Sequence, residues 1–182
     1  MISDVRRLAL LEEAWYPALA RNGNTLLAAW RGFRPADSIL EPESIHIATI
    51  EDNGPADTTV VATGHFHRAP RLIAADNGWI LLAIERSDGD WSLVRRDFGP
   101  ELAANRETAL SSEGARVSHF DAVASGGGAI IWTQAADAGR SVVFRPLEAD
   151  APAITLATGS YRRVCDRAGR GQGRRRRDRG DE

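Results

Sequence analysis

The sequence contains no lysine, a single cysteine and no long hydrophobic run. The single cysteine, Cys165, excludes an intramolecular disulfide framework and a cluster of thiolate metal ligands. No apolar stretch approaches the roughly 20 residues that a membrane-spanning helix needs. The first residues, "MISDVRRLALLEEAWYP", carry charges where a secretory signal peptide has its apolar core. We therefore expect a cytoplasmic protein without a membrane segment.

All the basic residues are arginines, and they are spread unevenly along the chain. Residues 1–160 carry 14 Arg and 21 acidic residues, a net charge of −7, whereas residues 161–182 carry 9 Arg and 4 acidic residues, a net charge of +5. The body is mildly acidic, which argues against a nucleic-acid footprint on its surface. The length of 182 residues fits one domain, because typical domains have roughly 100–200 residues.

A pair of apolar strands occurs three times in the sequence. The three stretches are "YPALARNGNTLLAAW", "APRLIAADNGWILLAIE" and "FDAVASGGGAIIWT". Their anchor residues Pro17, Pro70 and Asp121 are 53 and 51 residues apart. An alternating third strand and a shorter fourth strand follow each pair. The third strands are "SIHIATIE", "DWSLVRRDF" and "RSVVFRPLE", and the fourth strands are "TTVVATG", "RETALSSEG" and "PAITLATG".

Four antiparallel strands in about 50 residues, repeated in tandem, are typical of a β-propeller blade. We therefore predict an all-β, propeller-like fold of about three consecutive four-stranded antiparallel blades, which is an incomplete propeller. A β-sandwich with a coincidental period is the alternative. The partial propeller spans residues 1–161, with an outer strand at 6–11 and repeats at about 15–64, 67–114 and 118–159.

The period and strand order resemble those of the sialidase-like β-propellers, over residues 8–160. The Asp-box of that group reads S-x-D-x-G-x-x-W and lies between the third and fourth strands. The nearest match, "SDGDW" from Ser87 to Trp91, has a different spacing and lies between the second and third strands. Asp88-Gly89 within it is therefore interpreted as a hairpin turn. The resemblance implies either a non-catalytic binding module or the remnant of a glycoside hydrolase.

Large polar and aromatic residues recur in the loops that lead into the first strands. Three of them stand two residues before an anchor, and three others lie beside them. The candidate ligand-binding residues are Trp15, Tyr16, His67, Arg68, His119 and Asp121. Aromatic faces stack on sugar rings, and Arg or His holds a carboxylate or hydroxyl group. The alternative is that Tyr16 and Phe120 pack between blades.

The histidines and carboxylates give no catalytic or metal motif. His65 and His67 stand two residues apart without a carboxylate at a helpful spacing, so we expect no metal and no cofactor. Sialidase-type hydrolysis, which the resemblance implies as the enzymatic alternative, uses a Tyr nucleophile with carboxylates and an Arg triad. Residues of these types are Tyr16, Glu85, Asp121, Arg31, Arg68 and Arg86. No local motif joins them, so the catalytic residues stay unassigned.

The Arg- and Gly-rich tail at residues 162–182 begins where a further first strand is due. One interpretation is a frame-shifted or truncated end of a longer propeller gene, because GC-rich DNA read out of frame encodes mostly Arg, Gly, Ala and Pro. The other is a disordered basic tail. An RNA-binding arm is disfavoured, because no aromatic residues are interleaved with the arginines. The expected partners are a carbohydrate or protein ligand and a second copy that pairs through exposed blade edges.

Overall fold

The computed structural model describes residues 13–33, 42–51, 54–55, 58–124, 127–136, 139–148 and 150–159. The strand expected at residues 6–11, the tail at 162–182 and Cys165 lie outside the described residues. The elements in the described ranges are β-strands. No helix in these ranges is long and apolar enough to cross a membrane.

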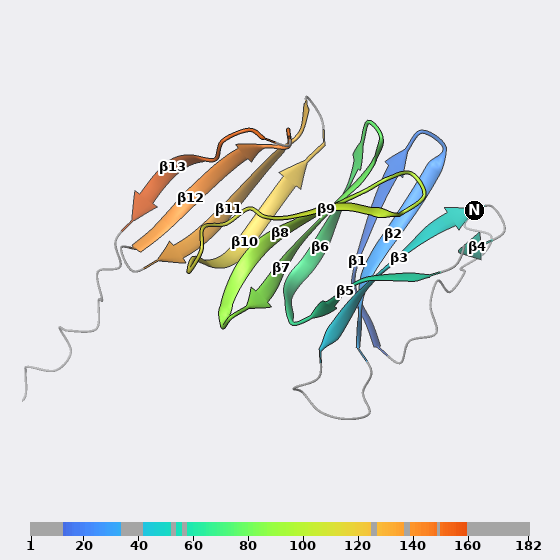
Figure 1. Ribbon diagram of the computed structural model, residues 1–182, viewed down its shortest axis with the longest axis horizontal. Helices are drawn as coiled ribbons and strands as arrows, with labels where there is room; N and C mark the ends of the chain where they lie inside the picture. The colour runs from blue at the N-terminus through green and yellow to red at the C-terminus, as the bar shows by residue number, and fades with distance from the viewer. Residues whose placement is uncertain are drawn as a thin grey trace, which may run out of the picture.

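The strands form three antiparallel sheets (Figure 1). The first sheet contains β1 (Glu13–Asn22), β2 (Thr25–Phe33), β3 (Glu43–Glu51) and β5 (Thr59–Gly64), and the short β4 (Gly54–Pro55) also pairs with β3. The second contains β6 (Phe66–Ala75), β7 (Gly78–Ser87), β8 (Asp90–Phe98) and β9 (Ala104–Ala109). The third contains β10 (Arg116–Val123), β11 (Ala129–Ala136), β12 (Gly139–Pro146) and β13 (Ile154–Gly159).

The predicted all-β fold and its three groups of four antiparallel strands are confirmed. Each group is a meander in which consecutive strands pair, apart from the two-residue β4 that the sequence pattern did not indicate. The predicted hairpin turn at Asp88-Gly89 joins β7 to β8, and both residues have positive φ, 51° and 93°. Such a backbone matches the right-handed twist of the flanking strands.

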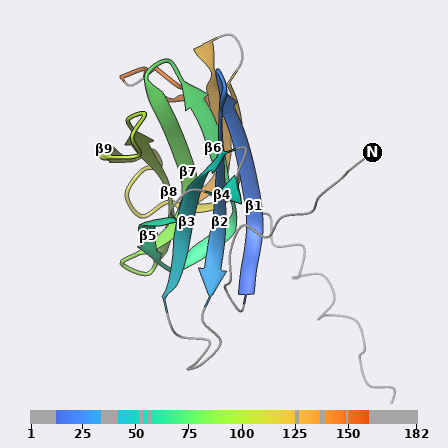
Figure 2. The same ribbon diagram turned by 90° about the vertical axis from the view of Figure 1, so that its right-hand side faces the viewer.

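The hydrophobic core lies in two layers, one on each face of the second sheet. One layer joins the first sheet to the second and includes Leu27, Ile45 and Leu81. The other joins the second sheet to the third and includes Ile80 and Trp132. The second sheet lies between the other two (Figures 1 and 2). This is why β7 is buried on both faces, as its continuous apolar sequence predicts.

Each sheet has an irregularity near the start of its first strand. The pairing register shifts between Trp15 and Ala18 in β1 and between His67 and Arg71 in β6. A third shift, in β10, immediately precedes His119. Bulges of this kind bend a strand and redirect its side chains. Two bulge residues are in the left-handed region without being glycine, with φ of 57° at Tyr16 and 71° at Arg68.

Candidate functional site

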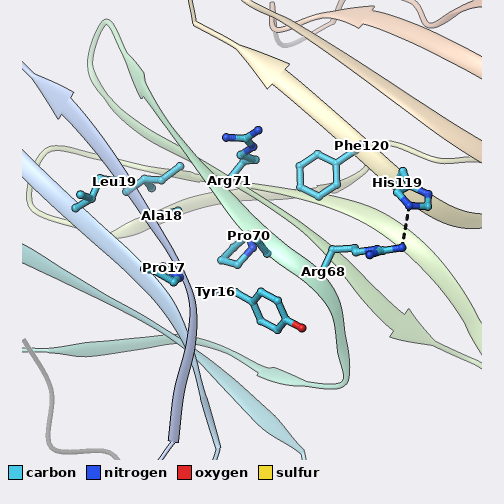
Figure 3. Close-up of a pocket in the computed structure, with 11 residues that line it drawn as sticks. Tyr16, Pro17, Ala18, Leu19, Arg68, Pro70, Arg71, His119 and Phe120 are labelled. Atoms are coloured by element: carbon cyan, nitrogen blue, oxygen red, sulfur yellow. Dashed lines mark hydrogen bonds between the residues drawn. The ribbon is translucent and has the colours of Figure 1, made fainter.

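The three bulged first strands meet at one groove of about 480 Å³ (Figure 3). Strands β1, β6 and β10 each contribute residues, so every sheet supplies one side of the groove. The lining residues are Tyr16, Pro17, Ala18, Leu19, Arg68, Ala69, Pro70, Arg71, Leu72, His119 and Phe120. The groove therefore joins positions that are about 50 residues apart in sequence and equivalent in the repeat.

Three of the candidate residues, Tyr16, Arg68 and His119, line this groove. Trp15 lies beside it, with its ring edge-on to Tyr16 at a centroid distance of 6.1 Å. Asp121 forms an ion pair with the groove residue Arg71, with 2.7 Å between Arg71 Nη2 and Asp121 Oδ1. The structure thus gathers five of the six candidates at or next to the groove.

The sixth candidate, His67, does not line the groove. Its imidazole packs against the indole of Trp91, with ring centroids 5.4 Å apart and the planes tilted by 46°. Trp91 lies on β8, next to the hairpin turn at Asp88-Gly89. His67 therefore packs at the end of the second sheet, outside the groove.

A hydrogen bond between the second and third sheets fixes two of the groove side chains. Arg68 Nη2 lies 2.8 Å from His119 Nε2, as the dashed line in Figure 3 shows. A guanidinium can only donate, so His119 Nε2 accepts and the ring proton is on Nδ1. This Nδ1 lies 3.2 Å from the hydroxyl oxygen of Ser118. The contact therefore requires a neutral His119.

Arg31 lies under the groove and connects the bulges of β1 and β6. Its Nε donates to Glu43 Oε2 at 2.6 Å, and Nη2 contacts the same oxygen. Nη1 donates to the backbone carbonyl of Arg68 at 3.0 Å, and the guanidinium carbon is 4.8 Å from the centroid of the Tyr16 ring. Arg31 thus contacts both bulge residues that have a left-handed backbone, Tyr16 and Arg68. Since it is only 8% exposed, its charge depends on these partners.

The groove is cationic although the body of the chain is acidic. Arg68 and Arg71 lie on its surface, and no carboxylate is among its lining residues. The carboxylate of Asp121 is paired with the groove residue Arg71 and is 62% exposed. A concave site that is lined by one sign of charge concentrates ligands of the opposite sign. The groove therefore suits an anionic ligand.

The pKa of His67 makes stability depend on pH. Burial lowers this pKa below its ordinary value of 6.5, and electrostatic interactions with Arg68, His119 and Arg31 lower it further. Below pH 6.5 the unfolded chain gains a proton here that the folded chain does not. The free energy of unfolding should therefore fall as the pH drops from 6.5 towards the folded pKa, and less steeply in His67→Gln. Urea denaturation at about pH 7.5 and about pH 5.5 measures this loss of unfolding free energy in the wild type and in His67→Gln. An equal loss in the two proteins would show that His67 is not its cause.

The residues of the sialidase-type set are not gathered at one place. Glu85 pairs with Arg96, at 2.6 Å, and Arg96 also pairs with Glu107, at 2.9 Å. This network lies within the second sheet, and neither Glu85 nor Arg86 lines the groove. Within the described ranges, no three His, Cys, Asp or Glu side chains are placed to hold a metal ion.

No family model matches the chain, and no curated protein matches it.

Proposed function

We propose that the three sheets are consecutive blades of a β-propeller and that the groove binds a carbohydrate that carries a carboxylate. One observation carries this proposal: the first strands of all three sheets meet at a single cationic groove. In a propeller, the first strand of each blade lies nearest the central channel, where ligands bind between blades. The contacts of β6 with β1 and with β10 support this order.

The groove side chains match the two chemical parts of such a ligand. Arg68 and Arg71 supply guanidinium groups, which bind a carboxylate through paired, charge-assisted hydrogen bonds. Trp15 and Tyr16 are 55% and 43% exposed beside the groove, and their rings offer flat apolar faces to a sugar. A volume of about 480 Å³ lies within the range of small-molecule sites, about 300–1,000 Å³.

Binding without hydrolysis is the better-supported function. A Tyr nucleophile needs an adjacent carboxylate as its base, whereas the charged group over the Tyr16 ring is the guanidinium of Arg31. Of the two acids in the sialidase-type set, Glu85 is paired with Arg96 in the second sheet and Asp121 is paired with Arg71. The proposed role is therefore recognition of the ligand.

Calorimetric titration of the full chain with an oligosaccharide that contains a uronic acid tests this proposal. The matched neutral oligosaccharide should bind more weakly. Arg68→Ala should weaken binding of the acidic sugar about tenfold or more, because a hydrogen bond to a charged group contributes about 1.5–3 kcal/mol. Arg106→Ala is the control, since Arg106 lies on β9 outside the groove.

Use of the full chain in every titration keeps the arginines of residues 162–182 constant, so that non-specific binding of anions cancels. Equal affinity for the acidic and neutral sugars, or equal weakening by Arg68→Ala and Arg106→Ala, would refute the proposed site.

A further inference from the structure

The exposed large hydrophobic side chains of the described residues are confined to three places. Trp15 and Tyr16 lie at the groove. The others belong to the first and third sheets, and none belongs to the second. They are Leu19 and Val60 in the first sheet and Val123, Ile131, Ile154 and Leu156 in the third. Leu19 also lines the groove. Contiguous exposed apolar surface is typical of protein contacts.

In the first sheet, the exposed side chains share the face turned away from the second sheet. Leu19 is paired with Ala28, and Val60 with His46, whose ring stacks on Trp30 at 5.7 Å. Ala28 and Trp30 belong to a small apolar cluster that is separate from the two core layers. We call this surface the leading face.

In the third sheet, too, the exposed side chains lie on the face turned away from the second sheet, at the other end of the row of three sheets. Ile131 is paired with Phe144, and Phe144 with Ile154, on the side that faces away from the second sheet. Val123 and Ile131 border a hollow of about 250 Å³ that Phe144 also lines. We call this surface the trailing face.

The repeat shows what normally covers a trailing face. Leu27, Ile80 and Ile131 are separated by 53 and 51 residues, the spacing of the repeat anchors. Leu27 is 0% exposed and packs towards the second sheet, and Ile80 is 5% exposed and packs towards the third. Ile131 is 40% exposed. The same position is therefore buried wherever another sheet follows.

The repeat also shows what normally covers a leading face. Leu72 stands 53 residues after Leu19. It is 7% exposed and packs in the layer between the first and second sheets, whereas Leu19 is 62% exposed. The leading and trailing faces are thus the two halves of the contact that already joins neighbouring sheets twice within the chain.

We propose that the trailing face of one copy of this chain packs on the leading face of a second copy, and that the reciprocal contact closes a two-fold dimer. The contact follows from the matched faces. The copy number rests on the propeller arrangement proposed above, in which four to eight blades close a ring. Two copies provide six sheets, whereas three copies would provide nine. A contact between unlike faces that closes by rotation forms a ring rather than a fibre.

Sedimentation of the full chain over a range of concentrations tests this dimer. The wild type should be a dimer, and Ile131→Arg and Leu19→Arg should each raise the dissociation constant about 100-fold or more, because each places a charge in both contacts. Ala104→Arg is the control, since Ala104 is exposed on β9 of the second sheet. An equimolar mixture of Ile131→Arg and Leu19→Arg should regain dimers, because the mixed pair keeps one unaltered contact.

Each other result overturns the dimer. A wild type that stays monomeric at all concentrations contradicts it. Loss of dimers in Ile131→Arg but not in Leu19→Arg indicates that two trailing faces pack together. Open-ended polymers contradict the closed ring and the propeller arrangement, while the sugar titration still tests the groove by itself. Circular dichroism verifies that each variant is folded, and Val60→Arg, on the same face, replaces a Leu19→Arg protein that is not.

Discussion

Gly78→Ala is expected to lower the free energy of unfolding by about 3 kcal/mol or more. Gly78 begins β7 with a φ of 147°, which side-chain-bearing residues rarely adopt. An added Cβ would lie 2.0 Å from the carbonyl oxygen of Phe98 on the paired strand β8. Strands β7 and β8, which belong to the most buried sheet, would have to move apart. Urea denaturation followed by circular dichroism measures the loss.

Gly23→Ala is the matched control for this substitution. Gly23 lies in the hairpin turn between β1 and β2 and also has a positive φ, 58°, but an added Cβ would meet nothing within 4 Å. The free energy of unfolding should fall there only by the cost of a left-handed backbone, about 1–2 kcal/mol. If the two variants were equally stable, the close approach of Gly78 to Phe98 would not be the cause.

Arg31→Met is the second substitution with a large expected effect. It keeps the apolar stem but leaves the Glu43 carboxylate, whose side chain is 24% exposed, without its guanidinium partner. It also removes the hydrogen bond to the carbonyl of Arg68. Breaking a buried ion pair by removing one partner costs about 3–5 kcal/mol. Because Glu43 is partly exposed, we expect the free energy of unfolding to fall by about 3 kcal/mol. The sugar affinity should fall as well, because Arg31 supports both bulges of the groove.

Arg71→Met provides the comparison for stability. Arg71 and Asp121 also form an ion pair, but their side chains are 54% and 62% exposed. An exposed pair contributes about 0–1 kcal/mol, so this variant should unfold at nearly the wild-type urea concentration. Similar losses in Arg31→Met and Arg71→Met would show that Arg31 does not hold the bulges together.

The strands could be predicted because their signals are local. Alternation in "DWSLVRRDF" and the continuous apolar run "WILLAI" depend on the faces that each strand presents. The repeat spacing then placed Trp15, Arg68 and His119 at equivalent positions, and the structure brings all three to the groove or its margin. A tandem repeat thus allows contacts between distant residues to be inferred from sequence alone.

The role of Arg71 could not be predicted, because it depends on the bulge. Residues three apart in a regular strand point to opposite faces, so alternation separates Arg71 from Arg68. The register shift and the left-handed backbone at Arg68 let both line the groove. Pro70 lies inside the bulge and is a signal for one, but a proline does not define how many residues a bulge contains.

The side-chain pairs between neighbouring strands could not be predicted from the sequence either. The sequence places Glu85 next to Arg86, but the ion pair forms with Arg96 on the neighbouring strand β8. Neighbours in a strand point to opposite faces, whereas residues on paired strands lie close together. His67 likewise turns to Trp91 on β8 instead of to the groove. Both outcomes depend on strand register, which the pattern of apolar residues does not define to single residues.

Because of the three bulges, the side chains at the groove can evolve separately from the apolar side chains that pack the sheets together. Each repeat unit carries its own bulge, so a duplication of the unit copies both a stable sheet and a side chain aimed at the shared groove. Under the proposed binding role, substitutions at Trp15, Arg68 or His119 would change which ligand is bound, while the apolar residues further along the same strands continue to hold the sheets together. Such a chain can acquire a new ligand one repeat at a time.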